Sequence, residues 1–344
     1  MNNKVAFIGE FPPPYGGVTI KDALLRDEFF NGDDFETFDL YAFKRTPLRF
    51  PLLCVSLLRF ILNADRIALG IGSNSRLDYL LRIISIVKGQ SFLENVTIFM
   101  MGRELPEYLA DNPGRLCDFS AVRCIFVESH SLVADFADLG CSKARYLPNF
   151  RNGDGACNPR AVGDAVHFVF FAQVRPEKGI DTLADAALAL IAEGYADKFD
   201  IDVFGRVVDD YKSEFERLVE RVPNMTYKGL VDAASENIYT ILNQYDAAVS
   251  SSSWREGMSG SNIECKFAGI ANIVSDAGFN SECVQDGVDG LIVKPRAVDS
   301  LTNAMRSVVG DHELLERLKR GSWESRVGYD AATWKQEVLD IVCN

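Results

Sequence analysis

Short apolar runs alternate with helical patterns along the whole 344-residue chain. A strand–helix alternation favours parallel sheets, because each parallel connection needs a crossover segment. Six strand-like runs lie in the first half of the chain and six in the second: Val5–Gly9, Phe35–Tyr41, Arg66–Ile71, Val96–Met101, Cys124–Glu128, Arg145–Leu147, His167–Val174, Phe199–Gly205, Met225–Gly229, Ala247–Ser251, Ala271–Ser275 and Leu291–Val293. The pattern predicts an α/β protein of two Rossmann-like domains, each a doubly wound parallel sheet.

The chain is longer than one hydrophobic core usually organises, so we expect two domains. The boundaries we predict are residues 1–150 and residues 165–325, with a C-terminal helix at 326–344 that packs back on the first domain. Arg151–Asp164 holds three glycines and a proline, as a linker would. Ligands of such sheets lie beyond the carboxyl ends of the strands, and the two domains are expected to face each other across a central cleft.

Composition excludes several classes of function. The net charge of −13 argues against binding to nucleic acid. No run of about 20 apolar residues is long enough to span a bilayer, and the N-terminus does not read as a signal peptide. The eight cysteines show neither a C-x-x-C pair nor metal-binding spacing, which predicts a reduced, cytoplasmic protein.

One basic stretch stands out in this acidic chain. Residues 44–90 carry eight Lys and Arg against two acids, a local charge of +6, and contain the apolar segment Phe50–Leu62. Two interpretations stay open. The segment is either a core helix whose neighbouring cations face solvent, or a surface that rests on anionic lipid headgroups as a peripheral contact with the inner membrane face.

The stretch from Ser250 to Glu282 is the richest in candidate site residues. Glu256 and Glu264 lie eight positions apart around a loop of glycine and serine, after an apolar run and before a helical pattern. The N-terminus of a helix attracts phosphate, and Gly257 and Gly260 allow a close backbone approach. We expect Glu264 in the first helical turn, where a carboxylate suits sugar hydroxyls rather than phosphate. A nucleotide-sugar site and an ordinary βα turn with two surface acids both remain open here.

Two other loops that follow predicted strands also carry candidate site residues. Gly16 and Gly17 end a proline-rich loop after the first strand, and their amides suit a phosphate or an acceptor oxygen, although a rigid turn would look the same. Arg175 and Lys178 lie between a strand and a helix, where they are placed to neutralise a diphosphate or, alternatively, to be solvated.

Five motifs in this order resemble those of the retaining GT-B glycosyltransferases, specifically glycosyltransferase family 4. The resemblance covers nearly the whole chain and is strongest over residues 168–293. The matching elements are the Glu-x7-Glu pair Glu256 and Glu264, Pro176-Glu177-Lys178-Gly179, Gly278 to Glu282, Asp286 to Val293, and Pro13-Pro14-Tyr15-Gly16-Gly17.

The resemblance implies a role for each matching residue. Glu264 binds the ribose hydroxyls, Glu256 lies beside the donor sugar, and Lys178 with Arg175 stabilises the leaving phosphate. We therefore expect Glu256, Lys178 and Arg175 to be the catalytic residues. The remaining expected donor contacts are Gly257, Met258, Ser259, Gly260, Gly205, Arg206, Gly229 and Leu230.

The chain departs from the family pattern in two places. Gln173 stands where many members have the phosphate-binding Arg, and Met101 stands where many have a His. His130 follows the fifth strand and is expected to pack or cap a helix. Asp200 and Asp202 look like a metal-binding pair, but they share one face of a strand and are expected to be solvated. We predict no metal site.

The predicted function is a retaining, hexosyltransferase-type glycosyl transfer without metal or cofactor. The donor is a UDP-sugar or a GDP-sugar. The acceptor is a hydroxyl of a glycan or lipid-linked glycan, in bacterial surface polysaccharide or glycolipid synthesis. The alternatives are a non-catalytic nucleotide-sugar-binding protein and a GT-B nucleotide-sugar epimerase.

Overall fold

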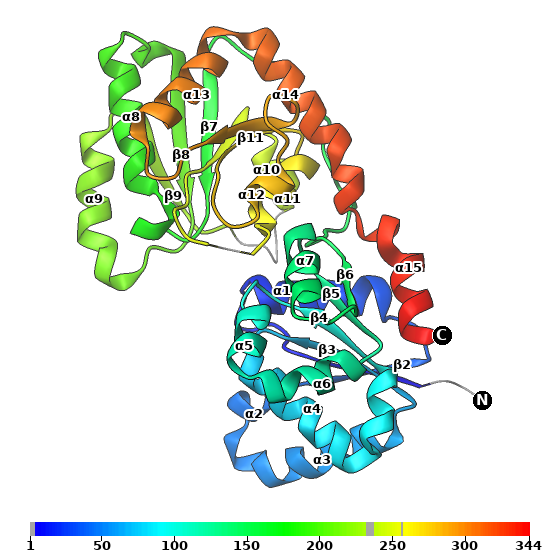
Figure 1. The fold of residues 1–344 in the computed structure, drawn as a ribbon. Coiled ribbons are helices and arrows are strands. Elements are labelled where there is room, and N and C mark those ends of the chain that lie inside the picture. Colours follow the sequence, from blue (N-terminus) through cyan, green and yellow to red (C-terminus); the bar gives the residue numbers. More distant parts are fainter. Residues whose placement is uncertain (1–3, 232–236, 256) are drawn as a thin grey trace. The chain divides into compact units, whose positions relative to one another are not determined.

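The computed structural model describes residues 4–231, 237–255 and 257–344. The chain forms two compact units, one made of Met1–Asn152 and Asp330–Asn344 and the other of Gly153–Tyr329 (Figure 1). Each unit contains a six-stranded sheet in which every pairing is parallel. The predicted α/β class with two parallel sheets is confirmed. Among the described helices, none combines the length and apolarity needed to cross a bilayer.

The sheet of the first unit has the strand order β2-β1-β3-β4-β5-β6. All five residues of β1 are buried, as are all five of β4, because parallel strands are covered by helices on both faces. The strands are β1 (Val5–Gly9), β2 (Phe35–Asp39), β3 (Arg66–Ile71), β4 (Val96–Met100), β5 (Cys124–Val127) and β6 (Ala144–Tyr146).

The helices of the first unit come from both ends of the chain. They are α1 (Gly17–Leu24), α2 (Ala42–Arg45), α3 (Phe50–Asn63), α4 (Asn74–Lys88), α5 (Leu105–Asp111), α6 (Leu116–Ala121), α7 (His130–Asp138) and α15 (Ala331–Cys343). Val338 and Val342 of α15 are buried in the same core as Phe99 and Phe126, whose rings stack 5.1 Å apart. The last helix of the chain thus completes the core of the first unit.

Helix α3 is not the core helix that one interpretation of the sequence favoured. Only Leu57 and Ile61 of this helix are buried, and Phe60 reaches the ring of Phe38 on β2 at 5.6 Å. The other apolar residues of α3 are exposed or half-exposed. Packing against one side of α3 therefore leaves most of its apolar side chains uncovered.

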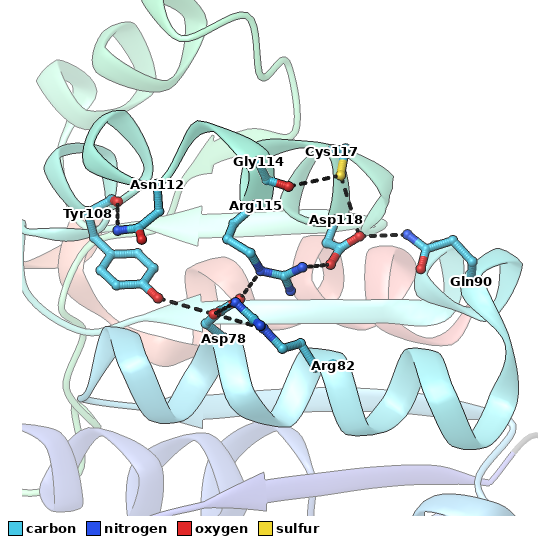
Figure 2. A network of polar contacts seen from close by, with 9 residues as sticks. All are labelled: Asp78, Arg82, Gln90, Tyr108, Asn112, Gly114, Arg115, Cys117 and Asp118. Carbon is cyan, nitrogen blue, oxygen red and sulfur yellow. Dashed lines mark hydrogen bonds and ion pairs between the residues drawn. The ribbon is translucent and has the colours of Figure 1, made fainter.

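A polar network ties α4, α5 and α6 together (Figure 2). Asp78 on α4 accepts hydrogen bonds from Arg115 at 2.6 Å and from Arg82 at 3.0 Å, and Arg115 also pairs with Asp118 at 2.5 Å. Tyr108 of α5 donates to Asp78 at 3.1 Å. Burial opposes ionisation of Asp78, but the hydrogen bonds from Arg115 and Arg82 outweigh it and lower the pKa of this carboxyl. The network fixes α5 and α6 on α4.

The second unit has the strand order β12-β11-β10-β7-β8-β9. Its strands are β7 (Val166–Phe171), β8 (Phe199–Phe204), β9 (Met225–Gly229), β10 (Ala247–Ser250), β11 (Ala271–Ser275) and β12 (Gly290–Val293). Its helices are α8 (Ile180–Ala192), α9 (Lys212–Arg221), α10 (Ile238–Leu242), α11 (Gly260–Phe267), α12 (Asn280–Cys283), α13 (Val298–Gly310) and α14 (His312–Ser325). Phe168, Phe170 and Ile273 are buried in a core that includes Leu183 of α8 and Met305 of α13.

Candidate functional site

The direction of strand addition reverses in the second unit between β7 and β10. From β7 the chain adds β8 and β9 on one side, and from β10 it adds β11 and β12 on the other. Open α/β sheets bind their ligands beyond the carboxyl ends of the strands at such a switch point. The segments in question are residues 172–179 and 251–259.

Direct hydrogen bonds join the two loops. Ser251 Oγ donates to the carbonyl of Gly179 at 2.8 Å, and the N–H of Ser253 donates to the carbonyl of Glu177 at 2.8 Å. Gly179 has a φ of +78°, and a Cβ there would lie 2.0 Å from the carbonyl oxygen of Ser251. Only glycine can be accommodated at this contact, so Gly179 allows the two loops to lie this close together.

Arg175, predicted to stabilise a leaving phosphate, is paired with a neighbour. Its Nε donates to Glu177 at 2.7 Å. This hydrogen bond lowers the pKa of Glu177, and the charge of Arg296 acts in the same direction. The guanidinium of Arg175 therefore has an anionic partner within its own loop.

A cavity of about 430 Å³ opens beside this loop at the N-terminus of α8. It is lined by Pro176, Glu177, Gly179, Thr182, Ser253 and Arg296. Arg296 has a φ of 57°, in the left-handed region that side-chain-bearing residues rarely adopt. The sequence analysis did not single out Arg296, although a Lys-Pro-Arg segment directly after β12 was the available signal.

Lys178 ends the short turn Pro176–Lys178, directly before α8. Its backbone N–H donates to the carbonyl of Arg175 at 3.0 Å, and its side chain is half-buried. The turn therefore carries a cation at the carboxyl edge of β7, as the sequence predicted.

The second loop leads into α11, whose N-cap is Ser259. Glu264 is the fifth residue of this helix, so it lies in the second turn and the prediction of a first-turn position was wrong. One helical turn therefore separates Glu264 from the loop residues that precede α11. Met258 is buried, whereas Gly257 and Gly260 are partly exposed. Glu256 lies outside the described residues.

Two buried contacts anchor α11. Lys266 is fully buried and pairs with Asp289 at 2.7 Å, while also donating to Ser325 Oγ of α14 at 2.9 Å. Asn262 donates to Asn280 of α12 at 3.0 Å. Asp289 belongs to the Asp-Gly-x-x-Gly segment of the sequence, and its contact gives that motif a structural role in positioning α11.

The first residue after β8 contacts the last residue of β9. The N–H of Gly205 donates to the carbonyl of Gly229 at 2.9 Å, and a Cβ on Gly205 would lie 1.8 Å from the carbonyl oxygen of Ala172. The structure thus brings Gly205 and Gly229 together beside the loop that follows β7. Arg206 and Leu230 follow them with exposed side chains, and Arg206 is 3.9 Å from Asp209.

Asp200 and Asp202 lie on one face of β8 and have protein partners. Asp200 contacts Nδ1 of His167 at 2.7 Å, and Asp202 accepts from Tyr245 at 2.8 Å and from Lys228 at 3.3 Å. In the part of the chain that the structure describes, no three His, Cys, Asp or Glu side chains gather as metal ligands would.

In the first unit, the loop after β1 is held by Thr19. Thr19 Oγ1 accepts from the N–H of Gly16 at 3.0 Å and donates to the carbonyl of Pro14 at 2.7 Å. A Cβ on Gly16 or Gly17 would meet nothing within 4 Å, so the backbone is open to an approaching ligand. His130, at the start of α7, stacks on Tyr146 at 4.0 Å, which is the packing role expected for it.

Buried charges at the ends of β1 and β5 were missed in the sequence. Glu10 is buried and pairs with Arg76, and Lys21 pairs with Glu128 at 2.6 Å. Asp22 Oδ2 accepts the N–H of Glu10 at 2.7 Å, and burial raises the pKa of Asp22 well above its ordinary value. An acid directly after a buried strand was the signal for Glu10, whereas Lys21 and Asp22 looked like ordinary polar residues of a helix.

Most of the second unit is similar to a known protein family. Residues 165–311 match the family model of Glycosyl transferases group 1. The matched range includes the loops after β7 and β10 and the whole of α11. No curated protein sequence matches the chain.

Solved structures resemble the whole chain. HepE of Anabaena, in complex with UDP, superimposes with a TM-score of 0.75 at 15% identity, with 99% of each chain covered. A sucrose-phosphate synthase from Thermosynechococcus elongatus has a TM-score of 0.72 at 16% identity, with 99% of each chain covered. A glycosyltransferase from Rickettsia africae has a TM-score of 0.69 at 12% identity, with 99% of this chain and 98% of the other covered. The predicted GT-B fold is confirmed.

Proposed function

We propose that this protein is a retaining glycosyltransferase that moves a sugar from a UDP-sugar or GDP-sugar to a hydroxyl acceptor. The observation that carries the proposal is the group 1 glycosyl transferase match over residues 165–311, which includes the switch point between β7 and β10. Structures of HepE, a protein of the same fold, hold UDP and UDP-glucose, which supports a nucleotide-sugar donor.

The proposed chemistry uses the loops described above. Negative charge builds on the phosphate oxygen as the bond to the sugar breaks, and Lys178 with the loop amides from Gly257 to Gly260 stabilises it. Arg175 acts with them once it exchanges Glu177 for the phosphate. Glu264 binds the ribose hydroxyls, and Glu256 is assigned to the donor sugar. The acceptor hydroxyl attacks from the face that the phosphate leaves, which retains the anomeric configuration, and its proton passes to the leaving phosphate oxygen.

The acceptor we propose is a glycan or lipid-linked glycan that binds residues 1–150, with surface polysaccharide or glycolipid as the product. The open backbone at Gly16 and Gly17 supports an acceptor contact there. A cytoplasmic setting is in keeping with eight cysteines that are all free thiols.

The test begins with a thermal-shift screen of UDP- and GDP-sugars, because a ligand of the folded state raises its melting temperature. The sugars that bind are then assayed for transfer to glycan acceptors, with and without EDTA. We expect transfer that survives EDTA and drops on the order of 10²–10³-fold in Lys178→Ala. Transfer at the wild-type rate in Lys178→Ala, or activity that EDTA abolishes and Mg²⁺ restores, would contradict the mechanism.

The pairing of Arg175 with Glu177 favours one alternative, a nucleotide-sugar-binding protein without catalysis. Such a protein would bind a donor and neither transfer nor hydrolyse it with any acceptor. A nucleotide-sugar epimerase would instead convert the donor when no acceptor is present. Product analysis of the same reactions therefore separates the three functions.

A further inference from the structure

The outward side of α3 and of the turn before it is lined with exposed apolar side chains. Leu48 is 98% exposed, Leu52 71% and Leu62 53%, and Val55 is exposed as well. Leu52, Val55 and Leu62 follow helical spacing and form one stripe. A helix on the surface of a protein in water normally presents charged residues on that side.

The stripe is held in place by contacts on the opposite side of the helix. Leu57 and Ile61 are buried, and Lys88 donates to the carbonyls of Leu62 at 3.0 Å and of Ala64 at 2.8 Å. These two hydrogen bonds fix the C-terminal end of α3 on α4. The exposed stripe therefore belongs to an anchored helix and is an apolar feature of the folded unit.

The charges that flank the stripe are all positive. Between Asp39 and Asp65 the chain has four cations and no acid. Arg45 pairs with Asp39 at 2.7 Å, and Lys44 lies over the ring of Tyr41. Within the residues that the structure describes, neither Arg49 nor Arg59 forms an ion pair or a side-chain hydrogen bond.

Arg49 does not stabilise the helix that it precedes. It is the N-cap of α3, and the first turn holds no acid. The N-terminus of a helix carries partial positive charge, so a cation there is unfavourable and an anion is favourable. The position of Arg49 thus suits an anion supplied from outside the protein.

Most other cations of the basic stretch serve the protein itself. Arg76 pairs with Glu10, Arg82 with Asp78, and Arg66 donates to the carbonyl of Asn344. The charge that faces outward is therefore concentrated around α3.

We propose that this α3 surface, made of Leu48, Arg49, Leu52, Val55, Arg59 and Leu62, lies in the headgroup region of an anionic lipid bilayer. The aliphatic side chains reach the acyl boundary while the two arginines bind lipid phosphates. A second copy of the chain fits this surface less well, because a two-fold contact would place the arginines of each copy against a surface whose charges are all positive. The proposal does not depend on sugar transfer.

The test is co-sedimentation of the full chain, without any sugar donor, with vesicles of phosphatidylcholine alone or mixed with phosphatidylglycerol. We expect binding to the anionic vesicles at low salt, weaker binding at high salt, and little binding to phosphatidylcholine. Arg49→Gln should lower the partition coefficient about fivefold. The double variant Leu52→Gln, Leu62→Gln should lower it by at least about tenfold.

Matched controls on the second unit carry the same chemical changes. Arg217→Gln and Val288→Gln alter an exposed cation and an exposed aliphatic residue, and we expect wild-type binding from both. Because the changed side chains are exposed, we expect every variant to be folded, and circular dichroism checks this.

Three results would overturn the proposal. They are no binding to anionic vesicles at low salt, equal binding to neutral vesicles, and equal losses in the control and α3 variants. Sedimentation velocity without lipid adds a fourth, a dimer that Leu52→Gln dissociates, which would assign the surface to a second copy. Each of these leaves the transferase assay unaffected, so the two proposals fail separately.

Discussion

Glu264 and Lys266 lie two positions apart on α11 and have different surroundings in the second unit. Lys266 is fully buried against Asp289 and holds the helix in place. Glu264 is only half-buried, in the second turn after the loop that follows β10. Residues two positions apart do not share a helix face, so α11 can be anchored on one side and bind a ligand on another.

Glu264→Gln should weaken nucleotide binding without unfolding the protein. The substitution keeps the shape of the side chain and removes its charge, and a lost charge-assisted hydrogen bond costs about 1.5–3 kcal/mol. Calorimetric titration with UDP and GDP measures the change, and Glu216→Gln on α9 is the exposed control. Equal affinities in Glu264→Gln and wild type would remove Glu264 from the donor site.

Asp22 should make the first unit less stable as pH rises. Burial raises its pKa in the folded state well above the ordinary value of 3.8, and the charge of Glu10 adds to this, although the N–H of Glu10 opposes it. The folded state therefore holds a proton that the unfolded state has released. The stabilisation is fully present below 3.8 and is lost as pH rises toward the folded pKa.

Asp22→Asn removes this titration, so the melting temperature of the variant should fall less than that of wild type between mildly acidic and neutral pH. The measurement is thermal unfolding at a series of pH values, and the readout is the slope of the melting temperature against pH. Asp27→Asn, an exposed residue close by, is the control. Parallel slopes in Asp22→Asn and wild type would show that Asp22 is ionised in the folded protein.

Among the elements, the loops after β7 and β10 depend on Gly179. Gly179→Ala combines an unfavourable positive φ with a Cβ 2.0 Å from the carbonyl oxygen of Ser251. Gly194 also has a positive φ, but a Cβ there meets nothing within 4 Å. Gly194→Ala should therefore cost about 1 kcal/mol from the backbone alone, and Gly179→Ala about 2–4 kcal/mol because the loops must also separate.

Chemical denaturation measures both variants, and nucleotide titration shows whether the loops still bind. We expect only Gly179→Ala to lose nucleotide affinity. If the two alanine variants are equally stable and bind equally well, the contact with Ser251 does not set the spacing of the loops.

The elements that the sequence predicted best are the strands. All twelve were found within two or three residues of their ends, because an apolar run between turn residues has few alternatives in an α/β chain. Helix α3 was harder, since periodicity cannot say whether the apolar residues on its outer side are covered. A linear pattern does not reveal which side chains a turn or the folding of the chain brings together. It therefore missed the pairing of Arg175 with Glu177, which a turn creates, and the burial of Lys21 and Lys266, whose partners are distant in sequence.

For the molecule as a whole, α15 is the element that joins the end of the chain to its beginning. Val338 is fully buried in the core of the first unit, whereas Gln336 on the same helix is exposed. Val338→Asp should destabilise the first unit by at least about 3 kcal/mol, because it removes an apolar contact and buries a charge. Gln336→Asp should leave its stability nearly unchanged.

Hydrogen exchange resolved by peptide measures the two units separately. We expect faster exchange in Val338→Asp across β1, β3 and β4, with the strands of the second unit protected as in wild type. Equal acceleration in both units would mean that α15 stabilises the chain as one cooperative block.

The position of α15 also has a consequence for how the protein is made. Residues 4–152 are translated before the second unit, whereas Ala331, Val338 and Val342, which complete their core, are translated after it. The whole of the second unit is translated in between, at a rate of about 5–20 residues per second. During that interval the nascent first unit displays the apolar surface around Phe29 and Phe150, on which a chaperone could act before the last helix arrives.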